Sequence, residues 1–271
     1  MPILGVFASA KPAKPVVTGG TLASDATYYY RTFTANGTLS VTQAPLSCDI
    51  LVVSGGGAGA NAQYVLSPFN NTLVGGGGGA GGLKLFTVTL SASSFTVTVG
   101  AGGSGAVGNN SSLDSYATTG GGYFQTNGGS GQGKSGWNNG TASAGAGITG
   151  EGNAGADYFN GVYNGGSAGG GGGSGAAGSN ANGGDGTNSY SAWASATSTG
   201  VSSRYAAGGA GAGGSPGTGG GGTAGSDSNG GNATANTGSG GGGTTVTSSS
   251  ATGGNGGSGI VIVRYTKAQV D

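Results

Sequence analysis

One segment of the chain matches a catalytic motif. Residues 128–135, GGSGQGKS, fit the phosphate-binding pattern G-x-x-x-x-G-K-[ST], in which loop N–H groups and a lysine, here Lys134, hold the phosphates of a nucleotide. That chemistry needs a buried strand before the loop and a helix after it. The preceding residues 123–126 are short and polar, and the following WNNG at 137–140 cannot open a good helix. A packed or solvent-facing glycine tract is the favoured interpretation, and a nucleotide hydrolase resting on Lys134 remains as a minor alternative.

The other residues that could act in catalysis or hold a metal are scattered. The eight acidic residues stand singly, whereas a calcium loop or a glycosidase pair needs clustered carboxylates. The segment GGDG at 183–186 fits a glycine–aspartate calcium repeat only once, which favours a solvated turn. Histidine is absent, so no Ser-His-Asp or Cys-His relay can form. Cys48 adjoins an apolar segment and is interpreted as a small buried residue. We expect no enzyme activity, no cofactor and no metal site.

Aromatic residues are the more informative set. Most of those between residues 100 and 258 fall in or beside polar connections between glycine tracts, and tyrosine, tryptophan, serine, glycine and asparagine together are typical of adaptable binding loops. Two interpretations stay open: a recognition surface for a sugar or a protein receptor, or packing at rod ends and in an oligomer core. The candidate receptor contacts are Tyr123, Phe124, Trp137, Tyr158, Phe159, Tyr163, Tyr190 and Trp193.

Composition limits the function classes. Glycine supplies 71 of the 271 residues, charged residues are 6%, and eight basic residues balance eight acidic ones. A chain with no basic excess has no electrostatic support for binding nucleic acid. No apolar run reaches the roughly 18 residues of a membrane-spanning helix, so membrane insertion is not expected. Hydrophobic content of 34%, much of it alanine, predicts a small apolar core.

The segments between the glycine tracts predict strands. They are rich in β-branched and aromatic residues with period-two alternation. Residues 49–54 and 259–265 are apolar on both faces, which indicates covered central strands. No segment carries a helical stripe of apolar residues. The sequence therefore predicts an all-β fold, a small β-sandwich or sheet without significant helix, with strands at residues 27–34, 38–41, 49–54, 83–90, 95–99 and 259–265.

Glycine tracts recur between residues 100 and 258, and two earlier ones lie at 55–59 and 75–82. They lack the strict triplet of collagen and fit an extended left-handed helix of three residues per turn, the polyglycine II conformation. Such rods have no internal hydrogen bonds, so their N–H and C=O groups must pair with neighbouring rods. We expect one glycine-rich β domain at 25–271. Strands at 25–99 and 259–266 frame a glycine-rich insertion at 100–258, which packs as rods and loops.

Residues 1–24 precede this domain. Their short apolar stretch has no basic leader in front of it, so we expect synthesis in a reducing cytoplasm without a signal peptide.

The order of these blocks resembles a known family. The run DILVVSGGG at 49–57, a glycine run into GLK at 82–84, FTVTVGAGG at 95–103 and GSGIVIVRY at 257–265 resemble the glycine-rich domain of bacteriophage tail proteins. The resemblance covers roughly residues 25–266. More loosely, the chain is similar to phage receptor-binding adhesins built on a polyglycine sandwich. The resemblance implies a virion structural component, often multimeric, with no catalytic residues.

The favoured hypothesis is a non-enzymatic tail fibre or tail-tip component located in the virion. Residues 1–24 would attach it to other virion proteins, and the glycine-rich region would contact a saccharide or protein of the host surface. Several copies would then bind with high avidity. A homo-oligomer is expected, a trimer by analogy with threefold phage fibres. The alternative is a capsid or tail decoration protein with a purely architectural role.

Overall fold

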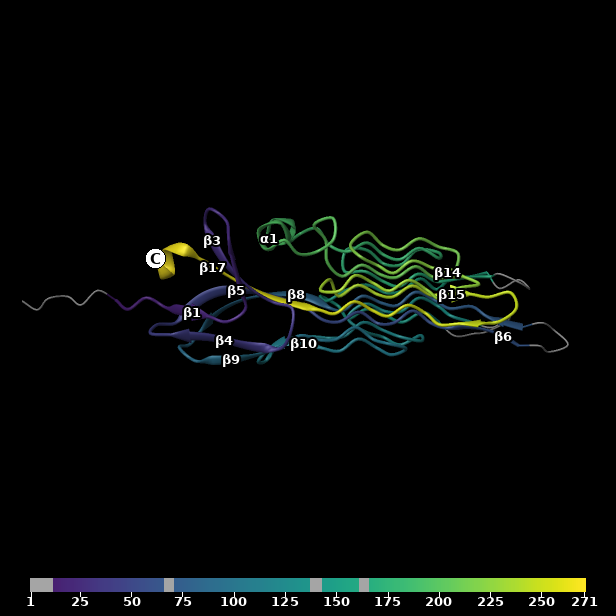
Figure 1. Ribbon diagram of the computed structural model, residues 1–271, viewed down its shortest axis with the longest axis horizontal. Coiled ribbons are helices and arrows are strands. Elements are labelled where there is room, and N and C mark those ends of the chain that lie inside the picture. Colours follow the sequence, from purple (N-terminus) through teal and green to yellow (C-terminus); the bar gives the residue numbers. More distant parts are fainter. Residues whose placement is uncertain (1–11, 66–70, 137–142, 161–165) are drawn as a thin grey trace, which may run out of the picture.

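The computed structural model describes residues 12–65, 71–136, 143–160 and 166–271, which form an elongated all-β molecule. Figure 1 shows two packed sheets at one end, together with strand β1 and the C-terminus. Extended runs of chain continue side by side from these sheets to the opposite end, where β6, β14 and β15 lie. The molecule thus has a sandwich end and a loop end.

Two five-stranded antiparallel sheets form the sandwich. The first sheet consists, in spatial order, of β1 (Val16–Thr18), β4 (Gly37–Thr42), β9 (Ser94–Thr98), β10 (Ser111–Leu113) and β11 (Tyr116–Thr118). The second sheet consists of β2 (Thr21–Ser24), β3 (Tyr28–Phe33), β17 (Ile260–Thr266), β5 (Leu46–Val53) and β8 (Leu83–Leu90). The last strand of the chain, β17, lies in the middle of its sheet between β3 and β5.

The core lies between the two sheets. Leu39 and Val41 of β4 are fully buried and pack in one cluster with Ile50 of β5 and with Val261 and Val263 of β17. The opposite faces of β5 and β17 are buried as well, in a second cluster that includes Trp193 and Tyr205 from the long connection 187–206. This cover explains why the sequences of β5 and β17 are apolar on both faces.

All six predicted strands are present, as β3, β4, β5, β8, β9 and β17. Two strands were missed at the N-terminal side. β1 and β2, joined through Gly19 and Gly20, are edge strands of the first and second sheets. The segment 1–24 is therefore not separate from the β domain, since residues 16–18 and 21–24 belong to the sandwich. They are short and carry exposed apolar residues, so their alternation gives little signal.

The glycine tracts form polyglycine II-like rods, and residues 75–82 show how one rod is hydrogen-bonded to its neighbours. Their backbone N–H groups donate in rotation to three neighbouring rods, residues 238–244, 119–122 and 169–172, at N···O distances of 2.7–3.1 Å. Gly76 is the exception, since a serine hydroxyl accepts its N–H at 2.8 Å. A helix of three residues per turn presents each third residue to the same side, which produces this rotation.

The rods lie too close together for side chains at most positions. A Cβ on Gly78 would lie 2.2 Å from the carbonyl oxygen of Gly57, and a Cβ on Gly56 would lie 2.0 Å from that of Ser239. Fully buried Ala58 and Ala80 show that some directions within the bundle admit a methyl group. Glycine is therefore required here by close backbone approach, in addition to its conformational freedom.

Asparagine and aspartate side chains close part of the bundle surface, in the sense that they accept backbone N–H groups that no neighbouring rod accepts. They stand three residues apart on one rod and accept the N–H groups of the next segment at 2.7–3.0 Å, where a further rod would otherwise be needed. The donor–acceptor pairs are Ser215 with Asn182, Thr218 with Asp185, Thr252 with Asn229 and Asn255 with Asn232.

The division between strand framework and insertion differs from the expected one. Residues 54–60 and 75–82 are buried rods, although they fall within 25–99, and β10 and β11 belong to the sandwich, although they fall within 100–258. The chain passes repeatedly between sandwich and rods. Short strands pair at or toward the loop end: β6 (Ala62–Val65), β7 (Asn71–Leu73), β12 (Phe159–Asn160), β13 (Ser167–Ala168), β14 (Gly225–Ser226), β15 (Thr244–Thr245) and β16 (Ser250–Ala251).

The described part of the chain contains two short helices, α1 (Ser191–Thr197) and α2 (Lys267–Val270). Alanine-rich α1 ends at Ser198, which adopts the left-handed conformation, with φ of 53°. Neither helix has the length or hydrophobicity needed to cross a bilayer.

Candidate functional site

The segment that matches the phosphate-binding pattern is a rod inside the bundle. Its N–H groups are engaged: Gly129 donates to Gly120, Ser130 to Ala80, and Gly133 to Gly77, at 2.9–3.0 Å. The Lys134 ammonium pairs with Asp157 at 3.2 Å. A phosphate loop needs N–H groups free to face the ligand. Residues 128–135 are therefore a packed rod of the bundle and do not form a nucleotide site.

The acidic residues act locally. Asp185 accepts an N–H of a neighbouring segment, Asp227 accepts from Thr247, and Asp114 accepts the N–H of Thr96. Across the described ranges, no group of three residues of the His, Cys, Asp and Glu types comes together in a way that could hold a metal ion.

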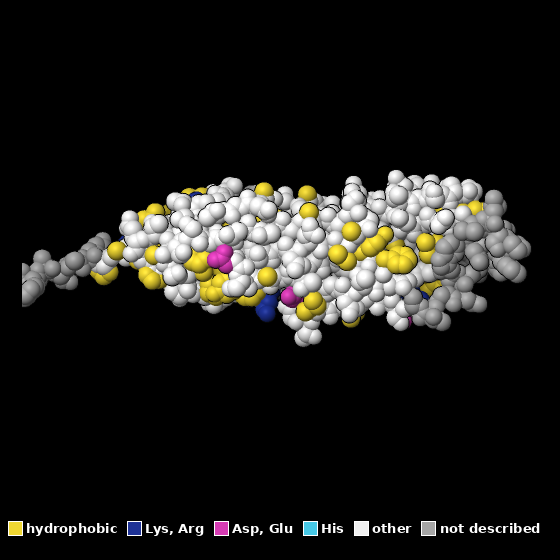
Figure 2. Space-filling view, turned by 90° about the horizontal axis from the view of Figure 1, so that it is seen from below, with side chains coloured by type: hydrophobic (Ala, Val, Ile, Leu, Met, Phe, Trp, Pro, Cys, Tyr) yellow, Lys and Arg dark blue, Asp and Glu magenta, His cyan; other side chains and the backbone are white. Residues whose placement is uncertain are grey.

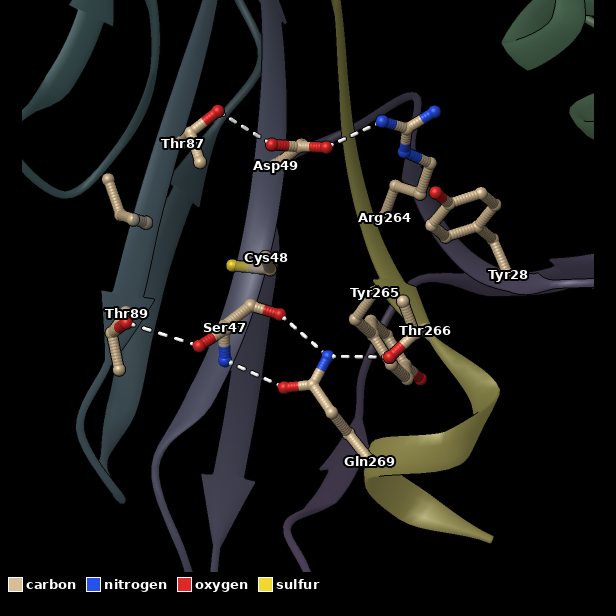
Figure 3. A pocket seen from close by; sticks show the side chains of 11 residues that line it. Tyr28, Ser47, Cys48, Asp49, Thr87, Thr89, Arg264, Tyr265, Thr266 and Gln269 are labelled. Carbon is tan, nitrogen blue, oxygen red and sulfur yellow. Dashed lines mark hydrogen bonds and ion pairs between the residues drawn. The ribbon is translucent and has the colours of Figure 1, made fainter.

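A groove of about 440 Å³ lies on the second sheet beside α2 (Figure 3). Figure 3 shows Asp49 between Thr87 and Arg264: the Thr87 hydroxyl donates to Asp49 at 2.7 Å, and the Arg264 guanidinium pairs with it at 2.6 Å. The guanidinium carbon also lies 4.4 Å from the ring centroid of Tyr28 and 4.5 Å from that of Trp193. Arg264 thereby joins the sheet to the connection that contains α1.

The remaining polar groups of this groove bind one another. The Gln269 side chain accepts the N–H of Ser47 and donates to the carbonyl of the same residue, both at 3.0 Å. Burial, with a smaller contribution from Asp49, raises the pKa of the Cys48 thiol to about 12. A thiol with such a pKa is a poor nucleophile near neutral pH. The polar groups of this groove therefore bind one another and hold β5, β17 and α2 together.

Two of the predicted receptor contacts lie beside the sandwich. Trp193 is 4% exposed and packs edge-on against Tyr30, with ring centroids 5.8 Å apart. Tyr190 is half-buried and packs against Trp193 at 6.1 Å. Trp193 thus fills a core cluster against the second sheet of its own chain, a position that differs from both the solvent-facing and the rod-end placements considered from the sequence.

Of the four further candidates, two lie within the residues that the structure describes. Phe159, on β12, and its neighbour Tyr158 are both half-buried, and Phe159 packs against a small cluster of Val74, Ala168 and Ala212. Trp137 and Tyr163 lie outside the residues that the structure describes.

Tyr123 and Phe124 remain on the surface. They lie in a turn that leaves the bundle between two rods, with ring centroids 6.1 Å apart, and Phe124 is 47% exposed. Together with Asn61, Gln63 and Asn229, they line a groove of about 390 Å³ beside β6 and β16. This groove combines aromatic and uncharged polar groups, which is the composition of an organic-ligand site.

The surface of the molecule carries few charges. Figure 2 shows one long face of the molecule, where uncharged polar groups and backbone predominate and apolar side chains form separate patches. Exposed large apolar residues are distributed over the whole length: Val16, Leu22, Val107, Phe124 and Ile148.

The fold defines an all-β protein in which a two-sheet sandwich supports a bundle of polyglycine rods. A family model described as "Glycine-rich domain" matches residues 32–266, and the chain belongs to this family. No curated protein matches the sequence.

Sequence reasoning missed the amide groups of the aromatic groove and the residues that close the bundle surface. The groove is assembled from β6, the turn at Tyr123 and the segments around residues 229 and 250, which no local pattern relates. The closing residues had a weak signal in the spacing of three between Asn182 and Asp185 and between Asn229 and Asn232, because that spacing is one turn of the rod.

Proposed function

We propose that the chain is a non-enzymatic structural component of a bacteriophage particle, a tail fibre or tail-tip appendage that contacts the host surface. The observation that supports this proposal is that the sandwich and the connections between rods lie at opposite ends of the molecule. Strand β1 and the C-terminus lie at the sandwich end, and the connections at β6, β14 and β15 lie at the loop end (Figure 1).

The rods supply the stiffness that such an arrangement needs. Consecutive N–H groups of one rod bind three neighbours, so no rod can bend without breaking bonds on several sides. A rod such as 75–82 is about 25 Å long at the rise of the extended helix. Stiff spacing favours avidity when several copies bind one surface.

The attachment surface of this proposal is the sandwich end. Val16 of β1 and Leu22 of β2 are 44% and 51% exposed, and they line a small groove together with Val270. Apolar groups at this end would pack against another virion protein or a second copy of the chain.

Lysine-directed cross-linking of intact particles tests the proposal. Lys14 and Lys267 lie at the sandwich end, whereas Lys134 is in the rod bundle. The proposal expects the chain in purified particles, with cross-links from Lys14 or Lys267 to other virion proteins and none from Lys134. Cross-links from Lys134 to neighbouring virion proteins would favour the architectural alternative, in which the rods pack inside a capsid or tail surface. Absence of the chain from particles would overturn both.

A further inference from the structure

The turn at residues 123–126 holds an aromatic residue, Phe124, in an unfavourable backbone conformation. Phe124 has φ of 45° and the following Gln125 has φ of 65°, both in the left-handed region that non-glycine residues seldom adopt. A bulky residue in this region costs free energy, and such strain persists where surrounding contacts enforce it. The turn nevertheless places an apolar ring in solvent.

A buried side chain of the adjacent rod enforces this turn. Gln132 is fully buried, and its Oε1 accepts the N–H of Gln125. Thr126 completes the turn, since its hydroxyl accepts the N–H of Tyr123 at 3.0 Å and donates to the Tyr123 carbonyl at 2.7 Å. These bonds therefore hold the backbone of the turn that carries both aromatic side chains.

Uncharged hydrogen-bonding groups line the same groove. The Oδ1 atoms of Asn61 and Asn229 accept the N–H groups of Gly253 and Thr252 at 2.9 and 3.0 Å. These bonds fix the two side chains, and each amide keeps its NH₂ group as a donor without a partner among the described residues. Gln63 and the hydroxyl of Ser250 add further donors and acceptors.

We propose that this groove binds a neutral saccharide, with a sugar face against Phe124 and Tyr123 and hydroxyl groups on the amides of Asn61 and Asn229. The ligand class follows from the lining. The aromatic rings offer an apolar platform, the amides and hydroxyls match sugar hydroxyl groups, and none of the described lining residues is charged. The volume of about 390 Å³ is that of a small-ligand site.

This inference rests on the proposed function, because it names the chemical class that the appendage would contact on a host surface. It adds to that proposal a location for the contact, the groove beside β6 and β16 that the turn at Tyr123 lines.

An array of neutral and acidic oligosaccharides, probed with the full chain, tests the inference. We expect binding to a neutral oligosaccharide. Phe124→Ala should weaken that binding at least about tenfold, and Phe124→Tyr should retain it. Ile148→Ala, which removes an exposed apolar residue outside the groove lining, is the matched control and should bind like the natural chain. Thermal unfolding of all variants verifies that each is folded.

Three outcomes would overturn the inference: no binding to any neutral oligosaccharide, binding confined to acidic ones, or equal binding by Phe124→Ala. Adsorption to host cells that depends on Phe124, survives periodate oxidation of surface glycans and is lost after protease treatment would identify a protein occupant instead. The cross-linking of particles is independent of these results. A chain that is found in particles but binds no saccharide would leave the proposed function standing and overturn the saccharide site. A chain that binds a neutral saccharide but is absent from particles would overturn the proposed function and leave the saccharide site standing.

Discussion

The backbone N–H of Gly78 donates to the carbonyl of Gly241 at 2.8 Å, although the two residues lie on rods far apart in the sequence. Gly78 also lies so close to the rod at residues 57–58 that a Cβ would meet the Gly57 carbonyl oxygen at 2.2 Å. Gly78 thus donates a hydrogen bond to one rod and, because it has no side chain, also lies close to another. Such contacts order a chain that is poor in apolar side chains.

Gly78→Ala should destabilise the protein by about 3 kcal/mol or more, because a Cβ forces two backbones apart inside the bundle. Gly105→Ala is the matched control. Gly105 has φ of 56°, and a methyl group added there would have no atom within 4 Å, so only conformational strain of about 1–2 kcal/mol is expected. Chemical denaturation of both variants measures the difference. Equal losses would show that close packing of rods does not explain the glycines.

The side chains that close the bundle surface give a second prediction. Asn182→Ala removes the acceptor of the Ser215 N–H, and we expect a loss of about 1 kcal/mol in the free energy of unfolding. Asn182→Asp keeps an Oδ1 at the same place and should be close to neutral. An alanine variant as stable as the natural protein would mean that solvent replaces the side chain without cost.

The buried position of Trp193 gives a third prediction. Trp193→Ala should lower the free energy of unfolding by about 3–5 kcal/mol, because it empties part of the cluster against Tyr30 and removes a ring that contacts Arg264. Val107→Ala, at an exposed residue of a rod connection, should change stability by less than about 0.5 kcal/mol. Thermal and chemical unfolding compare the two variants. A stable Trp193→Ala chain would contradict a packing role.

Stability should also fall at high pH. Burial, and to a smaller extent the hydrogen bond to Asp25, raises the pKa of Tyr30 from 10 to about 12. The neutral phenol is favoured in the folded state, so its contribution is complete below pH 10 and is lost as the pH rises from 10 to 12. Tyr30→Phe should flatten the dependence of unfolding free energy on pH in this range. An unchanged slope in that variant would assign the alkaline loss to other groups, such as Cys48.

Much of the fold could be predicted from the sequence. The alternation and β-branched content of β3, β4, β8 and β9, and the apolar runs of β5 and β17, are local signals of strands, and the scarcity of proline and of triplets in the glycine tracts favours polyglycine II rods over collagen. Which rod lies beside which could not be predicted, because glycine carries no side chain to mark its neighbours.

The candidate site was less accessible to sequence reasoning. Among the candidate aromatics that the structure describes, Tyr123 and Phe124 line a groove, with Tyr123 half-buried and Phe124 exposed. Trp193 has the same local composition around it, but the contacts of Tyr30 and Arg264, distant in sequence, make it a core residue. Burial of an aromatic in a polar connection therefore depends on tertiary packing that the connection itself does not encode.

The central claim is that the amides of the glycine rods are hydrogen-bonded to neighbouring rods. Hydrogen–deuterium exchange of the full chain, resolved by residue, tests it most directly. The structure predicts that residues 75–82 and 54–60 exchange as slowly as the central strands β5 and β17, because all of them open only when the molecule unfolds. Exchange of those glycines at the rate of an unstructured peptide, while β5 and β17 stay protected, would contradict the account.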